Sequence, residues 1–309
     1  MSTVINVLLP IFGLILVGYL CRRGGVLGAN AATELNRFVV WLCLPALLFK
    51  ATATASWQQI WHPGFVISYT ASMMIVFVLT LALRRRGTRS LADASIDGLG
   101  AAYANTGYIG IPLCVLVLGN DGLEPALIAT LLVAFVLFSV AVVCVEIGQH
   151  AGTTFGQAVK KVLIALAKNP LIAAPVAGAL WAMAGAPLPA PAQLFLGTLG
   201  AATTPCALVS LGLFLAHEQR GSRQGTSLLV LMKMLLQPLI CWVLAFKVFA
   251  LPPLWANAAL LLSALPTGTG PYMLAEFYKR EAALVSATIL YSTIMSIATL
   301  SACIYWIKH

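Results

Sequence analysis

Two short stretches place polar and helix-breaking residues inside otherwise apolar sequence. The first is "ANTGYIGIPL" at 104–113 and the second is "LPTGTGPY" at 265–272. Glycine and proline destabilise a helix interior, so each stretch predicts a helix that is interrupted midway. Proline suits the first turn of a helix, where its missing N–H and fixed φ lose nothing. We therefore expect a new half-helix to begin near Pro112 and another near Pro271.

Two such interruptions could bind an anion. The N-terminus of a helix carries unpaired N–H groups and partial positive charge, which favour a negatively charged group. Amide and hydroxyl side chains at both breaks add donors and acceptors. The alternative is a pair of proline kinks whose polar groups bond to their own backbone. The predicted substrate-binding residues are Asn105, Thr106, Gly107, Gly110, Pro112, Thr267, Gly268, Thr269, Pro271 and Tyr272.

The composition is that of an integral membrane protein. Hydrophobic residues make up 61% of the chain and charged residues only 9%, which is far outside the range of soluble domains. The formal net charge is +9, but the Lys and Arg residues lie in small clusters between apolar runs. Such clusters are typical of membrane topology signals. We expect a lipid bilayer as partner and no nucleic acid.

Ten apolar runs approach the length of about 20 residues that a spanning helix needs. The fold class expected is all-α, with ten transmembrane helices and no segment left for a soluble domain. The runs cover approximately 4–21, 32–53, 63–83, 94–119, 123–148, 162–184, 191–216, 226–250, 254–276 and 282–307.

Basic residues predict the orientation of the helices. Lys and Arg are enriched in cytoplasmic loops, and here they follow the odd-numbered runs. Both termini are therefore expected outside, in the periplasm of a bacterium. Arg22 and Arg23 come after the first apolar run, whereas a signal peptide has its positive charge before the run. The basic residues that follow odd-numbered runs are Arg22, Arg23, Arg84, Arg85, Arg86, Arg89, Lys160, Lys161, Lys168, Arg220, Arg223, Lys279 and Arg280.

Prolines recur at a nearly constant offset. Three pairs predict two homologous five-helix repeats at 1–149 and 162–309, joined by a cytoplasmic linker at 150–161. An odd helix count inverts the second repeat. The alternative is that proline is common in membrane helices anyway. The offset is 160 for Pro10 and Pro170, 160 for Pro45 and Pro205, and 159 for Pro112 and Pro271. Predicted helix breaks or hinges are Pro45, Pro112, Pro205, Pro266 and Pro271.

Ionisable residues inside membrane segments are candidates for ion coupling. Asp97 and Glu146 are hypothetical proton sites, and the alternative for Asp97 is solvation at the interface near Arg84 and Arg89. The lysines at 50, 233 and 247 are expected toward helix ends, where they reach the interface.

Motifs for metal or catalytic chemistry are absent from the sequence. The seven cysteines are scattered through apolar runs without CxxC spacing or a histidine partner, which favours small buried hydrophobes. The sequence contains no HExxH, GxSxG or Walker pattern. We expect no metal, no cofactor and no enzymatic activity.

Asn105 followed by "GIPL" at 110–113, together with "LPTGTGPYMLAEFY" at 265–278 and "LNRFVVWLCLPALLF" at 35–49, resembles the auxin efflux carrier family. This family includes plant auxin exporters and bacterial permeases for malonate and related acids. The resemblance implies that helices 1, 2, 6 and 7 form a scaffold domain. Helices 3–5 and 8–10 would form a transport domain that crosses itself at the two prolines. It also implies a secondary transporter, commonly a homodimer, that works by elevator or rocking motion.

Departures from the plant pattern bear on the substrate. Only a short segment at 148–161 stands where plant exporters carry a long hydrophilic loop, as in bacterial members. Thr267, Thr269 and Gly270 stand where plant members have a Gln and bulky aliphatics. A smaller or more polar pocket favours a compact carboxylate. The resemblance therefore implies a permease for malonate or a related acid in the bacterial inner membrane.

Two other functions are compatible with the sequence. One is a sodium-coupled organic anion symporter of the bile-acid transporter type, which shares the ten-helix plan. It would need clustered oxygen ligands, and only Asn105 and Glu276 are obvious. The other is a membrane ligand sensor that does not transport. Sensors usually carry a soluble output domain, for which the helices and short loops leave no segment.

Overall fold

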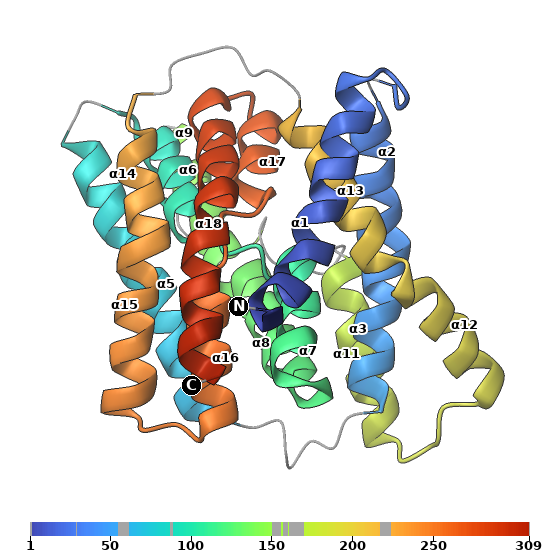
Figure 1. Cartoon of the computed structure of the whole chain (residues 1–309). Coiled ribbons are helices and arrows are strands. Elements are labelled where there is room, and N and C mark those ends of the chain that lie inside the picture. The colour runs from blue at the N-terminus through green and yellow to red at the C-terminus, as the bar shows by residue number, and fades with distance from the viewer. Residues whose placement is uncertain are drawn as a thin grey trace. The chain divides into compact units, whose positions relative to one another are not determined.

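The computed structural model (Figure 1) describes residues 2–28, 30–54, 62–86, 89–149, 156, 160, 170–216 and 224–308. All named elements in these ranges are helices, and the extended backbone forms only an isolated bridge. Most of the predicted linker at 150–161 lies outside the described residues, as do Lys161, Lys168, Arg220 and Arg223.

The helices overlap the predicted apolar runs, and residues 162–169 of the sixth run lie outside the described residues. In the first half they are α1 (Ser2–Arg23), α2 (Ala31–Phe38), η1 (Val39–Cys43), α3 (Leu44–Ala53), α5 (Pro63–Arg85), α6 (Leu91–Ala102), η2 (Thr106–Gly110), α7 (Ile111–Leu118), η3 (Asn120–Gly122), α8 (Leu123–Leu132), η4 (Val133–Leu137) and α9 (Phe138–Gln149). In the second half they are α11 (Pro170–Met183), α12 (Ala190–Ala201), α13 (Thr203–Leu215), α14 (Thr226–Leu231), η5 (Met232–Leu236), α15 (Gln237–Trp242), η6 (Val243–Val248), α16 (Pro253–Ser263), α17 (Gly270–Phe277) and α18 (Ala283–Lys308).

Within the described residues, six helical stretches are long and apolar enough to cross a membrane. They are Ala31–Ala53, Pro63–Arg85, Asn120–Gln149, Ala190–Leu215, Thr226–Val248 and Ala283–Lys308. The prediction of an all-helical, multi-pass membrane protein is therefore confirmed. The count of ten spanning helices and the inverted repeat remain predictions.

Two of the spanning stretches contain a π-helical turn just before a proline. Pro45 lies in the first turn of α3, directly after η1, and Pro238 lies in the first turn of α15, directly after η5. Proline cannot donate the backbone hydrogen bond that the preceding turn would receive, so the helix widens locally. Pro205 is also near a helix start, at the third position of α13.

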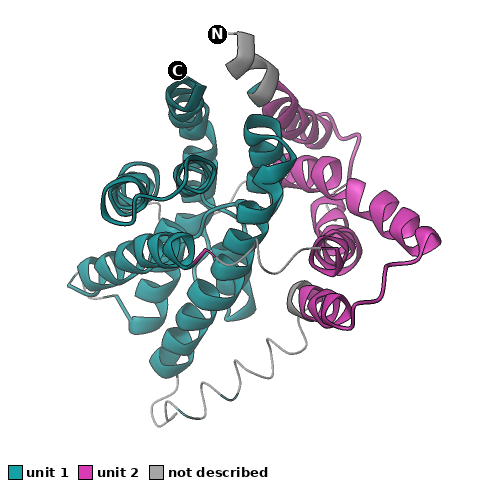
Figure 2. Ribbon diagram, turned by 90° about the horizontal axis from the view of Figure 1, so that it is seen from below, with its two compact units in different colours: residues 1–8, 63–162, 218–309 teal, residues 9–62, 163–217 magenta. Residues whose placement is uncertain are grey.

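The chain divides into two compact units (Figure 2). Unit 1 contains Met1–Leu8, Pro63–Val162 and Glu218–His309, and unit 2 contains Leu9–His62 and Leu163–His217. Each unit thus combines segments from both predicted repeats.

Glycines allow several helices of unit 2 to pack closely. Gly18 of α1 lies against the backbone of Val209 in α13, and Gly212 of α13 lies against the backbone of Ile15. Gly200 lies similarly against Leu47 of α3. Small residues let membrane helices approach closely, which provides the van der Waals contact that holds them together in lipid.

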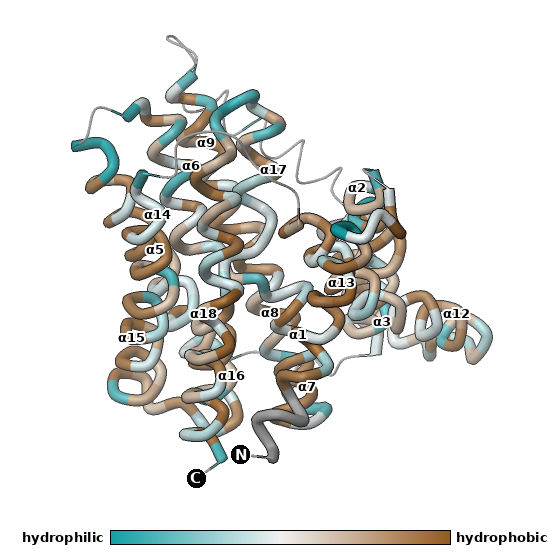
Figure 3. The backbone as a smooth tube through the Cα atoms, turned by 45° about the horizontal axis from the view of Figure 1, so that its top comes forward, coloured by the Kyte–Doolittle hydropathy of each residue, from teal (hydrophilic) through white to brown (hydrophobic). Residues whose placement is uncertain are grey.

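Helices of unit 1 turn apolar side chains outward. Figure 3 shows that hydrophobic residues predominate along the helices, including α15 and α18. An exposed stripe along α14, η5, α15 and η6 consists of Leu231, Leu235, Leu239 and Val243. Exposed leucines at a spacing of four residues are expected where a helix faces lipid.

Candidate substrate site at two interrupted helices

The first interruption separates α6 from α7. The chain leaves α6 after Ala102 and reaches η2 at Thr106. Asn105 has φ −77° and ψ 60°, and the N–H of Thr106 donates to the carbonyl of Ala104 at 2.8 Å. These features define an inverse γ-turn centred on Asn105. Pro112 lies in the first turn of α7, directly after η2 in the continuous helical stretch Thr106–Leu118, and cannot donate the backbone hydrogen bond that the preceding turn would receive.

The second interruption separates α16 from α17. Residues 264–269 are non-helical, and Pro266 lies among them. Pro271 lies in the first turn of α17. Helical structure is therefore interrupted at both segments for which the sequence predicts a break.

The two interruptions pair with each other. Ala104 and Thr267 form an antiparallel bridge. The N–H of Asn105 donates to the carbonyl of Pro266, and the N–H of Gly268 donates to the carbonyl of Tyr103, both at 2.9 Å. In Figure 1, α6 and α17 lie toward one end of unit 1, and α7 and α16 lie toward the other. The bridge thus joins two broken helices of opposite direction and satisfies backbone groups that the breaks expose.

Asn105 has an unused side-chain group at this junction. Asn105 is only 5% exposed to solvent, and its side-chain Nδ2 has no hydrogen-bond partner among the described residues. Its main chain is fully engaged, because its carbonyl accepts from the N–H groups of Ile109 and Gly110 at 3.2 and 3.0 Å. A buried amide without a partner destabilises a fold by about 1–3 kcal/mol, so it is a candidate ligand-binding group.

Thr267 makes only internal bonds at this junction. Its hydroxyl donates to the carbonyl of Gly100 at 2.9 Å, and its N–H donates to the hydroxyl oxygen of Ser292 at 3.0 Å. Gly100 lies in the last turn of α6, where carbonyls have no helical partner. Thr267 therefore fastens α16–α17 to the end of α6 and to α18.

Glycines allow the chain to approach Tyr103 and α16. A Cβ at Gly270 would lie 2.6 Å from the ring of Tyr103, and one at Gly268 would lie 3.0 Å from it. A Cβ at Gly110 would lie 2.8 Å from the side chain of Leu265. A Cβ at Gly270 or Gly268 would press against the ring of Tyr103, so the close approach there favours glycine, whereas at Gly110 the flexible end of Leu265 can move aside.

The other predicted site residues lie within a few positions of the bridge residues along the chain. Thr106 and Pro271 are buried. The half-buried members are Gly107, Pro112, Thr269 and Tyr272.

Asp97 lies in a cluster of arginines. Its carboxylate accepts from the Nε of Arg84 at 2.7 Å and from the Nε of Arg89 at 2.8 Å. Protonation of Asp97 would leave two guanidinium groups without their shared counter-charge. The contacts therefore favour a structural role over the hypothetical proton site.

Glu146 has a different environment. It is buried in α9 and accepts a hydrogen bond from the hydroxyl of Tyr278 at 2.7 Å. The side chain of Gln149 donates to the carbonyl of Tyr278 at 3.3 Å. These contacts link α9 to the end of α17.

A second ion pair holds the start of α6. Arg280 donates from Nε to Asp93 at 2.7 Å, and Ser90 donates to the same carboxylate. Burial alone would raise the pKa of Asp93, but the bonds from Arg280 and Ser90 outweigh it and lower the pKa below its ordinary value.

Lys233 contradicts the expectation that lysines lie toward the interface. It is fully buried in η5, and its Nζ donates to the carbonyl of Ser263 at 2.7 Å. Ser263 is the last residue of α16, so the ammonium sits at the C-terminal end of a broken helix. The expectation failed because position along a span does not reveal which face of the helix is buried. Gln237 and Cys241, at intervals of four residues on the same face, were the available signal.

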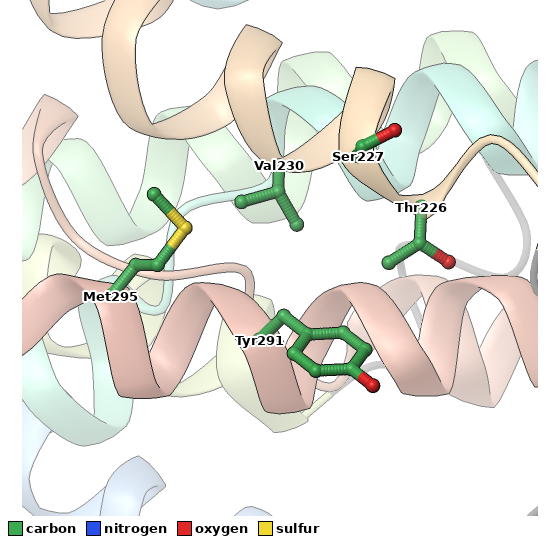
Figure 4. A pocket seen from close by; sticks show the side chains of 5 residues that line it. All are labelled: Thr226, Ser227, Val230, Tyr291 and Met295. Carbon is green, nitrogen blue, oxygen red and sulfur yellow. The ribbon is translucent and has the colours of Figure 1, made fainter.

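The described residues contain no group of three or more His, Cys, Asp or Glu side chains that could hold a metal ion. One cavity of about 430 Å³ lies between α14 and α18, lined by Thr226, Ser227, Val230, Tyr291 and Met295 (Figure 4). None of the predicted site residues lines it.

Comparison with known proteins identifies the family. A family model described as "Membrane transport protein" matches residues 3–304. The chain belongs to this family of membrane transporters. The resemblance to auxin efflux carriers is thereby confirmed, and the family indicates a transporter rather than an enzyme.

Relatives extend over nearly the full chain. A Rhizobium meliloti protein named "Putative malonate transporter" is 31% identical over 100% of this chain and 97% of its own length. An "Uncharacterized transporter" of Methanothermobacter thermautotrophicus is 28% identical over 97% of this chain and 95% of its own. A third, also called an uncharacterized transporter, comes from Methanocaldococcus jannaschii, with 24% identity over 96% of each chain.

Proposed function

We propose that this membrane transporter is a permease for a small organic anion, with malonate or a related dicarboxylate as substrate. The observation that carries the proposal is the amide of Asn105, which is buried at the paired breaks and keeps its Nδ2 free of partners among the described residues. The name of the Rhizobium meliloti relative supports malonate as the first acid to test.

Electrostatics at the breaks favour an anion. The α17 helix begins at Gly270, next to the bridge, and η2 begins directly after Asn105 and continues into α7. Helix starts present N–H groups and partial positive charge. Hydrogen bonds from such donors to a carboxylate are about twice as strong as neutral ones. In this proposal Asn105, Thr106 and Thr269 bind the substrate, while Thr267 and the glycines position them.

In this proposal, the two compact units have different roles in alternating access. Unit 1 holds both breaks and would be the transport domain, and unit 2 would be the scaffold, as the auxin carrier resemblance implies. The ten-helix inverted repeat, with crossover at Pro112 and Pro271, belongs to the same proposal. The proposal also includes assembly as a homodimer, a location in the bacterial inner membrane and termini in the periplasm.

Sodium coupling of the bile-acid transporter type is less well supported. A sodium site needs several oxygen ligands close together. Glu276, the second expected ligand, is exposed on α17, while Asn105 is buried at the break. A carboxylate on the surface cannot complete a site around a buried amide.

The test is counterflow of labelled malonate into liposomes that contain the purified protein. With unlabelled malonate inside, we expect saturable uptake that other small dicarboxylates inhibit and that needs no sodium. Uptake that requires sodium would support the symporter. Absence of uptake with malonate and its homologues would contradict the permease, and binding without uptake would support a sensor.

A further inference from the structure

The buried side chain of Lys233 is the least expected charge in the protein. It is 0% exposed, in a stretch from Thr226 to Val248 that is long and apolar enough to span the membrane. The opposite face of the same stretch carries the exposed Leu231, Leu235 and Leu239. A charged residue within a spanning segment destabilises insertion by about 2.5–3.5 kcal/mol or more. A charged residue that is retained despite this cost, on the helix face that packs against the protein, is expected to have a function.

No carboxylate compensates Lys233 within the described part of the chain. Its Nζ donates a hydrogen bond to the carbonyl of Ser263. On α6, Asp97 is held by Arg84 and Arg89. A buried ammonium with a carbonyl as its partner carries a net charge that needs another source of compensation.

Other titratable groups on the neighbouring elements do not supply a negative charge. On its own helix, Cys241 is a buried thiol that hydrogen-bonds to the carbonyl of Ala259 in α16. On α5, Tyr69 is buried and its hydroxyl has no partner among the described residues. On α18, Tyr291 is exposed. The helices α14 and α16 carry no ionisable side chain.

Lys233 acts on the proposed anion site through α16. The carbonyl that accepts the hydrogen bond from Lys233 belongs to Ser263, the last residue of α16. Four residues later, Thr267 pairs with Ala104, the neighbour of Asn105. When it is protonated, Lys233 therefore neutralises the negative end of the half-helix that leads into the binding segment. In sodium-coupled carriers, half-helix C-terminal ends of this kind bind the sodium ion.

Gln237 provides a second, independent observation. It lies one turn after Lys233 on the same face and is 0% exposed. Neither its Oε1 nor its Nε2 has a hydrogen-bond partner among the described residues. A donor and an acceptor are thus free in the same buried region, where they can hydrogen-bond a water molecule that carries a proton to or from the amine.

We propose that Lys233 is the coupling residue of the carrier: its amine takes up one proton when the anion binds and releases it with the anion, without sodium. The proton comes from water on the entry side and forms the third N–H bond of the ammonium. On release the bond breaks and the proton returns to water on the exit side. The anion supplies the counter-charge that the described residues lack. This inference rests on the proposed anion-permease function.

Malonate affinity measured against pH, in sodium-free buffer, tests the inference. Between pH 7 and 9 a carboxylate stays ionised, so a change in affinity reports protons taken up by the protein. Uptake of one proton per anion strengthens binding by up to about tenfold for each unit of falling pH. The variants are Lys233→Met and, as matched control, Lys247→Met. Lys247 lies on the same stretch, exposed and above the ring of Trp242.

We expect the affinity of the wild-type protein and Lys247→Met to rise as pH falls, and that of Lys233→Met to be weaker and independent of pH. Equal pH dependence in Lys233→Met would overturn the inference alone. If Lys233→Met does not fold, the measurement on the wild-type protein still tests the inference. A malonate affinity that is independent of pH, or malonate binding that requires sodium, would overturn the inference. Absence of malonate binding and counterflow in the wild-type protein would instead overturn the proposed function, and the inference with it.

Discussion

Ala104 and Thr267 form an antiparallel bridge that joins the two interrupted helices of unit 1. They are far apart in the sequence, yet each lies between a helix that has just ended and one that is about to begin. The bridge fixes two helix starts and the buried amide of Asn105 in one place. The following predictions test which residues build this arrangement and which ones use it.

Gly270→Ala should destabilise the junction. The added methyl group would lie 2.6 Å from the ring of Tyr103, and that ring packs edge-on against Phe138 with centroids 6.3 Å apart. Overpacking of this kind destabilises by about 1–3 kcal/mol. We expect a melting temperature several degrees lower than that of the wild-type protein in detergent.

The matched control is Gly13→Ala, because a Cβ at Gly13 has no atom within 4 Å. Alanine is also the better helix former, so no loss of stability is expected there. Equal melting temperatures for the two variants would show that the approach to Tyr103 is not constrained.

Thr267→Val should lower stability because it removes a hydroxyl that bridges two helices. The carbonyl of Gly100 would lose its bond from Thr267, and an unpaired buried acceptor costs about 1–3 kcal/mol. Thr288→Val is the control, since Thr288 donates within its own helix to the carbonyl of Leu284. Thermal denaturation of both variants measures the difference. A larger loss for Thr288→Val would contradict the fastening role of Thr267.

Acid should weaken the contact between Arg280 and the start of α6. The pKa of Asp93 is lowered in the folded protein, so its contribution to stability is present above the unfolded-state pKa of about 4. That contribution is lost as the pH falls through the folded-state pKa. Arg280→Gln removes the main partner and should therefore lose less stability than the wild-type protein as the pH falls from 6 to 3. Parallel stability curves would show that the pair does not contribute.

The sequence was informative about the breaks and less so about their contacts. Glycine and proline at 104–113 and 265–272 act locally on the backbone, so their effect is readable without a fold. The partner of the Thr267 hydroxyl is Gly100, 167 residues away, and no spacing rule reveals such a bond. Lys233 was misplaced because the burial of a helix face is decided by its neighbours.

Asp97 is a second residue whose partners could not be predicted from the sequence. A carboxylate in an apolar run predicts an ion-coupling site. Its arginine partners, at 84 and 89, fold back onto it from the end of α5 and the segment before α6. Sequence proximity to the basic cluster suggested solvation, whereas the structure shows direct ion pairs.

The central claim is that the buried amide of Asn105 binds the anion, and malonate affinity in Asn105→Ala tests it most directly. Asn120→Ala is the control, because Asn120 is exposed beyond the end of α7. A hydrogen bond to a charged group is worth about 1.5–3 kcal/mol, so we expect Asn105→Ala to bind malonate at least about tenfold more weakly. Asn120→Ala should bind like the wild-type protein, and both variants should fold. Wild-type affinity in Asn105→Ala would place the substrate elsewhere and contradict the account.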